Sequence, residues 1–99
     1  MKGKARTERE KRFHDELSQL GCIACRIDGR INTYVSIHHV NGRTRPGSHM
    51  QVLPLCASHH QDQGNGVIAV HPWKARFEKI YGNQYDLIEQ CKELINWQE

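Results

Sequence analysis

Two pairs of potential metal ligands stand out in the sequence. Cys22 and Cys25 are separated by two residues, and Cys56 and His59 repeat that spacing farther along the chain. Two intervening residues let a tight turn direct both side chains at one ion, and three thiolates with one imidazole complete a tetrahedral zinc site. Such a set leaves no open coordination position, so we expect a structural zinc site. The alternative is two unrelated pairs of buried or reactive groups.

The expected cellular setting favours metal binding over disulfides. The charged N-terminus has no apolar stretch of the kind found in secretory signals, which predicts a cytosolic, reducing environment. Cysteines in that environment are more often metal ligands or buried thiols than disulfide partners. The fourth cysteine, Cys91, falls on the apolar face of a predicted helix, and we expect it in the core.

Histidines beside these pairs are candidates for a second centre. His38 and His39 are adjacent in a segment with the composition of a strand, and His60 directly follows His59. Successive side chains on a strand point to opposite faces, so His38 and His39 are poorly placed to bind the same ion. One can be a ligand while the other acts as a base, and His60 can reach back toward them. His14 is expected on the polar or boundary face of the first helix, without a role.

The first predicted helix delivers the chain to the first zinc pair. Thr7 and Glu10 have the spacing of a capping box, and Gly21 stands where a glycine commonly ends a helix. Between them, apolar residues recur at helical spacing: Phe13, Leu17 and Leu20. These signals predict a helix over 8–20.

The pattern that follows predicts two short strands and then helices. Residues 33–39 and 51–55 are rich in β-branched or apolar side chains, and Pro54 indicates an edge or a strand end. A helical segment from Ala57 is expected to run until Gly64. Two further helices are expected, one opened by His71-Pro72 and one capped by Asn83.

The chain is expected to form one α+β domain over 7–99, after a basic, disordered segment over 1–6. Only 37% of its residues are hydrophobic, and no run approaches the roughly 18 apolar residues that a membrane span needs. Lysine and arginine crowd residues 1–12, whereas acidic residues predominate after Gly82. This asymmetry fits a protein that presents one side to a polyanion such as DNA, although a solubilising tail has the same pattern.

Several motifs occur in a specific order: Gly21-Cys22-Ile23-Ala24-Cys25, Ile37-His38-His39, Arg45-x2-Ser48-His49, Leu53-Pro54-Leu55-Cys56-x2-His59-His60, Gly64-x-Gly66-Val67 and Tyr81-Gly82. This order resembles the Ref family of bacteriophage-encoded nucleases, which cut DNA held by RecA filaments. The match runs from about Gly21 to the last helix. Within it, the segments around His38 and His60 resemble the ββα-metal motif of HNH endonucleases. The resemblance implies a small zinc-stapled ββα-metal (HNH) domain with flanking helices.

The resemblance also implies roles for individual residues. His38 and His60 would bind a catalytic divalent ion, with His38 in a position that many HNH proteins fill with aspartate. His39 would be the general base. His71 and His49 both match family positions for a third ligand or a phosphate contact, and we prefer His71 as the ligand. The ion is left open among Mg²⁺, Zn²⁺ and Mn²⁺, since three imidazoles suit a transition metal whereas nuclease chemistry often uses magnesium.

Two further parts of the expected site are the support of the base and the DNA contacts. The middle motif position, usually asparagine, falls near Gln51, and Asn41 is a second candidate for orienting the base. Contacts to DNA phosphates are expected from a loop, a histidine and the N-terminal arm: Arg43, Arg45, His49, Lys4 and Arg6.

The implied function is a metal-dependent DNA endonuclease or nickase, with DNA and possibly the RecA filament as partners, in the cytoplasm of a bacterial host. No membrane partner is expected. The alternative is a non-catalytic, zinc-stapled module that binds DNA or a recombination protein. Metal-dependent nicking distinguishes the two.

Overall fold

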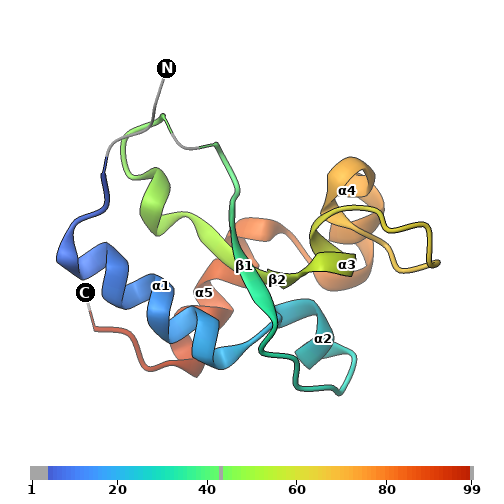
Figure 1. Ribbon diagram of the computed structural model, residues 1–99, viewed down its shortest axis with the longest axis horizontal. Coiled ribbons are helices and arrows are strands. Elements are labelled where there is room, and N and C mark those ends of the chain that lie inside the picture. The colour runs from blue at the N-terminus through green and yellow to red at the C-terminus, as the bar shows by residue number, and fades with distance from the viewer. Residues whose placement is uncertain (1–4, 43, 99) are drawn as a thin grey trace.

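The computed structural model describes residues 5–42 and 44–98. Figure 1 shows a small α+β arrangement with a two-stranded sheet at its centre. Its elements, in chain order, are α1 (Glu8–Leu20), α2 (Ile23–Ile27), β1 (Val35–His39), the 3-10 turn η1 (Ser48–Met50), β2 (Val52–Cys56), α3 (Ala57–His60), α4 (Val70–Tyr81) and α5 (Gln84–Leu94).

The sheet positions the adjacent histidines. β1 and β2 pair antiparallel, with His38 opposite Leu53 and His39 opposite Val52. Helices α1, α2, α3 and α5 all contact β2, and every residue of β2 is buried. β2 is therefore the strand packed into the core. In β1 only His38 is buried, while Ser36 is exposed and the other three residues are partly covered. Pro54 lies within β2, in a sheet of two strands where each strand has one open edge.

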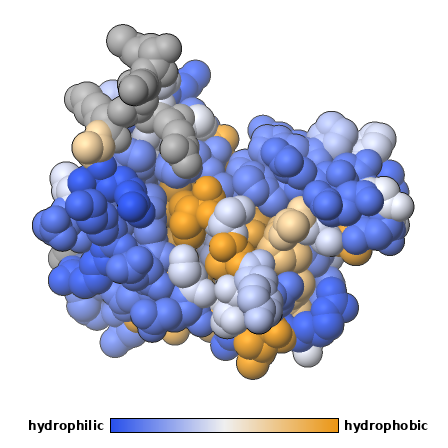
Figure 2. All heavy atoms as spheres, in the orientation of Figure 1, coloured by the Kyte–Doolittle hydropathy of each residue, from blue (hydrophilic) through white to orange (hydrophobic). Residues whose placement is uncertain are grey.

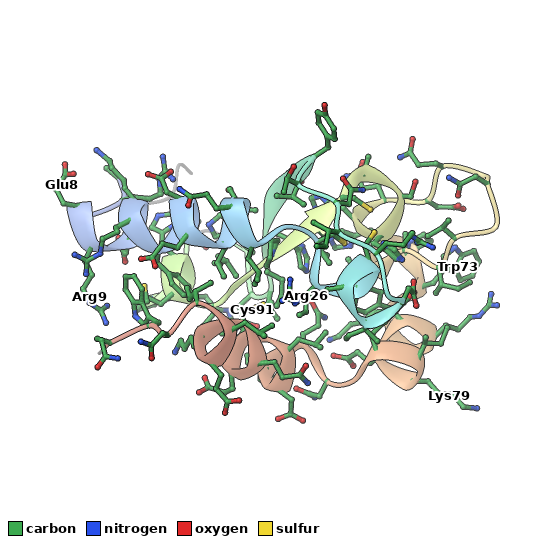
Figure 3. The ribbon with its side chains drawn as sticks, turned by 90° about the horizontal axis from the view of Figure 1, so that it is seen from below. Glu8, Arg9, Arg26, Trp73, Lys79 and Cys91 are labelled. Atoms are coloured by element: carbon green, nitrogen blue, oxygen red, sulfur yellow. The ribbon has the colours of Figure 1, made fainter. Side chains whose placement is uncertain are left out.

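The core lies between β2 and the long helices. Its largest fully buried side chains include Phe13, Leu17, Leu53, Leu55, Phe77 and Leu87. Cys91 belongs to this cluster with no exposed surface, which confirms its expected place in the core. Figure 3 shows it on the inward side of α5. Burial of the apolar side chains is the main stabilising term that a domain of this size has apart from bound metal.

Helix α1 has the predicted ends. The Thr7 hydroxyl accepts a hydrogen bond from the Glu10 amide while the Glu10 carboxylate accepts one from the Thr7 amide, which completes the capping box. Gly21 ends the helix at a φ of 91°. A Cβ at this position would lie 2.6 Å from the Asn32 carbonyl oxygen, so only glycine lets the chain turn here toward Cys22.

Two predicted helices differ from the structure. α3 ends at His60 instead of continuing to Gly64, because Gln61 is extended and forms a parallel bridge with His71. His71 is also extended, with φ and ψ of −111° and 117°, so the first turn of α4 is not regular helix. The Asp62 amide donates to the His71 carbonyl at 2.9 Å. This pairing, which the sequence did not reveal, brings His71 beside the end of α3.

The last helix follows the prediction more closely. The Asn83 side chain accepts from the Tyr85 amide at the start of α5, as expected of a cap. After α5, Trp97 packs on Phe13 with ring centroids 4.9 Å apart. The guanidinium groups of Arg9 and Arg12 lie 5.2 and 5.1 Å from the centre of the same indole ring. These contacts tie the C-terminal segment to α1.

The described surface is mostly polar. Figure 2 shows hydrophobic atoms along the middle of one face, where Figure 1 has β1, with hydrophilic surface on both flanks. Within residues 5–42 and 44–98, no helix combines the length and apolar character needed to cross a bilayer.

Candidate metal centres and active site

All seven histidines of the chain take part in three compact groups of potential metal ligands. In each group, the ligand atoms lie within 4.8 Å of one another. The groups are Cys22, Cys25, Cys56 and His59; His38, His60 and His71; and His14, His39 and His49. The hydrogen bonds around each group show what chemistry it can perform.

The first group has the dimensions of a tetrahedral zinc site. His59 Nδ1 lies 3.6 Å from the sulfurs of Cys22 and Cys25 and 3.2 Å from that of Cys56, and the sulfurs of Cys25 and Cys56 are 3.8 Å apart. In a tetrahedral zinc site, bond lengths of about 2.3 Å to sulfur and about 2.0 Å to nitrogen place two sulfurs roughly 3.8 Å apart. They place the nitrogen roughly 3.5 Å from each sulfur. These four buried residues can therefore hold a metal ion such as zinc.

The surroundings of this group also suit a metal. His59 Nε2 lies 3.1 Å from the Tyr81 hydroxyl, which donates to Asp28 Oδ2 at 2.8 Å. This chain turns Nδ1 toward the sulfurs, as partners of metal-bound histidines usually do. Burial raises the pKa of the Cys22 thiol to about 12, so without a cation this sulfur keeps its proton. Metal binding would displace that proton.

The second group is formed by three segments that the fold brings together. His38 comes from β1, His60 from the end of α3, and His71 from the bridge next to Gln61. The ring centre of His38 lies 5.1 Å from that of His60 and 5.0 Å from that of His71. His38 is buried, His60 is half-buried and His71 is exposed, so the group opens to solvent on one side. That arrangement suits an ion that must also contact a substrate.

Hydrogen bonds leave one nitrogen of His38 and one of His60 for an ion. His38 Nε2 donates to Gln84 Oε1 at 2.8 Å, so the lone pair is on Nδ1. The Ser36 hydroxyl lies 3.0 Å from His60 Nδ1, so Nε2 is the nitrogen of that ring left for an ion. Burial lowers the pKa of His38 to about 4 and also lowers that of His60, so both rings are neutral near pH 7. Neutral imidazole is the form that binds metal.

Gln84 provides a direct test of this arrangement. Gln84→Leu removes the acceptor for His38 Nε2, so we expect affinity of the three-histidine group for a divalent ion to fall about 10–100-fold. Gln84→Glu keeps an acceptor and serves as the matched control. Cobalt titration followed by visible absorption distinguishes ion binding by the three histidines from ion binding by the thiolate site. Unchanged affinity in Gln84→Leu would show that the Gln84 contact is unimportant.

The third group is connected internally by hydrogen bonds. His39 Nε2 lies 3.0 Å from His49 Nδ1, and His14 Nε2 lies 2.6 Å from the His49 carbonyl oxygen. Arg6 Nη1 lies 3.1 Å from His14 Nδ1. Because a guanidinium beside a ring nitrogen opposes a second cation, this group suits proton transfer better than metal binding. It lines a pocket of about 410 Å³ together with Ala5, Arg6, Ser36 and Ile37.

All three members of the third group line this pocket. Ser36, whose hydroxyl contacts His60 of the second group, also lines it. His38 and His39 thus belong to different groups, as the alternation of side chains along β1 predicts.

Residues 6–96 match the model of a family described as recombination enhancement, RecA-dependent nuclease. The chain belongs to this family. The family name gives it a nuclease function linked to RecA and to enhanced recombination. The Ref resemblance drawn from the motifs is therefore confirmed at the level of the family.

The remaining residues predicted for the site of this RecA-dependent nuclease are the candidates for supporting the base and for contacting DNA. Gln51 Oε1 accepts from Asn41 Nδ2 at 2.6 Å, and Asn41 Oδ1 accepts from the Tyr85 hydroxyl at 2.7 Å. The Gln51 carbonyl accepts from the Val40 amide, directly after His39. Arg45 is exposed. Lys4 and Arg43 lie outside the described residues, as does most of the segment expected to be disordered, whereas Arg6 contacts His14.

Sequence reasoning missed three supporting residues of the nuclease. His14 was expected on a polar or boundary face without a role, but it is buried and contacts His49. Gln84 is buried on His38, and Tyr81 links His59 to Asp28. Tyr81 fell within a recognised motif, whereas His14 and Gln84 carry no local signal because their partners are far away in the sequence.

The buried His14 makes stability depend on pH. Burial lowers its pKa below the ordinary value of 6.5, despite its bond to the His49 carbonyl. At a pH between the lowered pKa and about 6.5, His14 is protonated in the unfolded chain but neutral in the folded protein. The contribution of neutral, buried His14 to the free energy of unfolding is therefore complete above about pH 6.5 and decreases as the pH falls below it. We expect the free energy of unfolding of the zinc-loaded protein to fall more steeply below pH 6.5 than that of His14→Gln, by at most about 1.4 kcal/mol per pH unit. Urea unfolding between pH 7.5 and 5 measures this, and equal slopes would contradict it.

Proposed function

We propose that this nuclease is a metal-dependent DNA endonuclease or nickase of the HNH type. The observation that carries the proposal is the pair of histidine groups on either side of β1: one with ring nitrogens directed at a common point, the other linked by hydrogen bonds. The order of β1, β2 and α3, with His38, His39 and His60 on them, supports a ββα-metal arrangement.

In this proposal, Cys22, Cys25, Cys56 and His59 hold a structural zinc ion, while His38, His60 and His71 hold the catalytic ion. When bound, that ion would polarise the scissile phosphate and stabilise the departing oxyanion. Imidazole ligands favour Zn²⁺ or another transition metal over Mg²⁺, which prefers oxygen ligands. We therefore expect Mn²⁺, Co²⁺ or Zn²⁺ to support cutting better than Mg²⁺.

His39 is the proposed general base. It lines the pocket and would take a proton from the water that attacks phosphorus. Gln51, with Asn41, would hold the end of β1 next to His39 through its bond to the Val40 amide. The pocket is wide enough for a phosphodiester and places Ser36 beside the same space.

The DNA backbone would be held by basic residues around this pocket. Arg6 lines it directly, and Arg45 lies on the loop that leads to η1. The remaining proposed contacts are Lys4 and Arg43, whereas His49, also expected from the sequence as a phosphate contact, lies against His39 and is assigned below to that ring. Because such contacts are electrostatic, affinity for DNA should fall steeply as salt rises. The family description supports a RecA filament as partner. The proposed setting is the cytoplasm of a bacterial host.

The test is a cutting assay with defined DNA substrates. Purified protein is incubated with supercoiled and single-stranded DNA, with and without a RecA filament carrying a displacement loop, in the presence of each divalent ion. We expect cutting that requires an ion, His39 and the filament. Binding without cutting under every ion would instead favour a zinc-stapled module that docks DNA or a recombination protein.

A further inference from the structure

Hydrogen bonds connect His14, His39 and His49 with one another and with Arg6. This chain of contacts starts at Arg6, whose Nη1 lies 3.1 Å from His14 Nδ1. It continues from His14 Nε2 to the His49 carbonyl oxygen at 2.6 Å. It reaches His39 through the 3.0 Å contact between His49 Nδ1 and His39 Nε2. The chain thus joins the segment before α1, α1 itself, η1 and β1.

Chemistry fixes the direction of its first two bonds. A guanidinium only donates, so Nδ1 of His14 accepts and its Nε2 carries the proton. That proton is donated to the His49 carbonyl, a bond that is buried. Burial lowers the pKa of His14, which keeps the ring neutral in this tautomer. This hydrogen bond therefore holds the main chain at His49 against helix α1.

The rings around His39 also restrict its orientation. Its ring lies edge-on to that of His49, with centroids 5.1 Å apart, and to that of His14, with centroids 5.8 Å apart. His14 is itself buried, on the helix whose residues Phe13 and Leu17 are fully buried. A base on a partly covered strand gains a fixed geometry only if such neighbours hold it.

We propose that His49 and His14 are positioning residues for His39: His49 accepts the Nε2 proton of His39, and His14 fixes His49. This inference rests on the proposed function of His39 as the base. With its proton on Nε2, His39 has its lone pair on Nδ1, where it takes a proton from the attacking water. The hydroxide oxygen then bonds to phosphorus while the leaving oxygen departs with the electron pair of its P–O bond.

Matched substitutions separate positioning from DNA binding. His49→Asn keeps an acceptor near the position of Nδ1, and His14→Gln keeps a donor near Nε2; His49→Leu and His14→Leu keep neither. We expect the leucine variants to lose about 10–100-fold in kcat with KM for DNA unchanged, and the amide variants to recover most of that loss. Cobalt spectra of the thiolate site and thermal unfolding verify that each variant is folded.

Different outcomes would overturn the inference. A raised KM with unchanged kcat in His49→Leu would make His49 a phosphate contact, and asparagine as poor as leucine would make the role one of packing. A wild-type protein that cuts nothing under any ion would instead overturn the proposed function itself.

A second measurement does not require cutting. Nitrogen NMR of protein with ¹⁵N-labelled histidine reports which ring nitrogen carries each proton. We expect His14 and His39 both to carry it on Nε2, and His14→Leu to disturb the His49 signals while His14→Gln preserves them. A proton on Nδ1 of His39, or an additional metal equivalent that depends on His14, would contradict the proposed chain.

Discussion

Cys22→Ala is expected to leave the chain largely unfolded. The four ligands tie α2, the end of β2 and α3 to one point, and all four are buried. Structural zinc binding contributes about 10–16 kcal/mol in small zinc domains, which is as large as the whole stability of a typical domain. Losing one thiolate weakens that binding and also opens the contact between α2 and β2.

Cys91→Ala is the matched control. Cys91 is also fully buried and burial raises the pKa of its thiol to about 12, but it lies in the apolar core and belongs to none of the three ligand groups. We expect this change to cost only about 1 kcal/mol. Circular dichroism during thermal unfolding, together with the zinc content, compares the two variants. A Cys22→Ala protein that lacks zinc yet unfolds cooperatively at the wild-type temperature would contradict a structural role.

His39→Ala is expected to reduce cutting about 10²–10⁴-fold while leaving the fold and both metal groups intact. The ring is half-buried, lines the pocket and is not part of the hydrophobic core cluster. Its ring contacts His14 and His49, which belong to the third group. The rate of nicking under single-turnover conditions measures this loss directly.

The neighbouring His38→Ala provides the contrast. This change should abolish cutting as well, but it should also abolish ion binding at the second group. In the proposed site, His38 supplies one of the three nitrogens that bind the ion. Metal content and nicking rate, measured on both variants, therefore separate the two roles. If His39→Ala lost the ion, or still cut at the wild-type rate, the assignment of His39 as the base would be wrong.

Much of this architecture follows from local signals in the sequence. The ends of α1 are set by Thr7, Glu10 and Gly21, each acting on its own turn of chain. The spacing of the cysteine pair and the alternation along β1 are also local, so the thiolate group and the separation of His38 from His39 could be predicted. Family motifs added the expected partnership of His38 with His60.

What could not be predicted depends on contacts between distant segments. His14 neighbours the core residues Phe13 and Leu17 along α1, yet its partner His49 lies 35 residues away. The bridge of Gln61 with His71 accompanies an irregular first turn of α4, and α3 ends at His60 where this bridge begins. Such pairings depend on how the loops close, which neither periodicity nor capping patterns record.

The four-residue helix α3 is shared by two centres. Cys56 and His59 serve one of them, and His60 serves the other from the very next position. An added residue in an α-helix turns everything after it by about 100° and advances it by about 1.5 Å. Ala57 and Ser58 can therefore vary in identity, but an insertion or deletion between Cys56 and His60 would misdirect one imidazole or the other. The length of this segment is constrained more strictly than its composition.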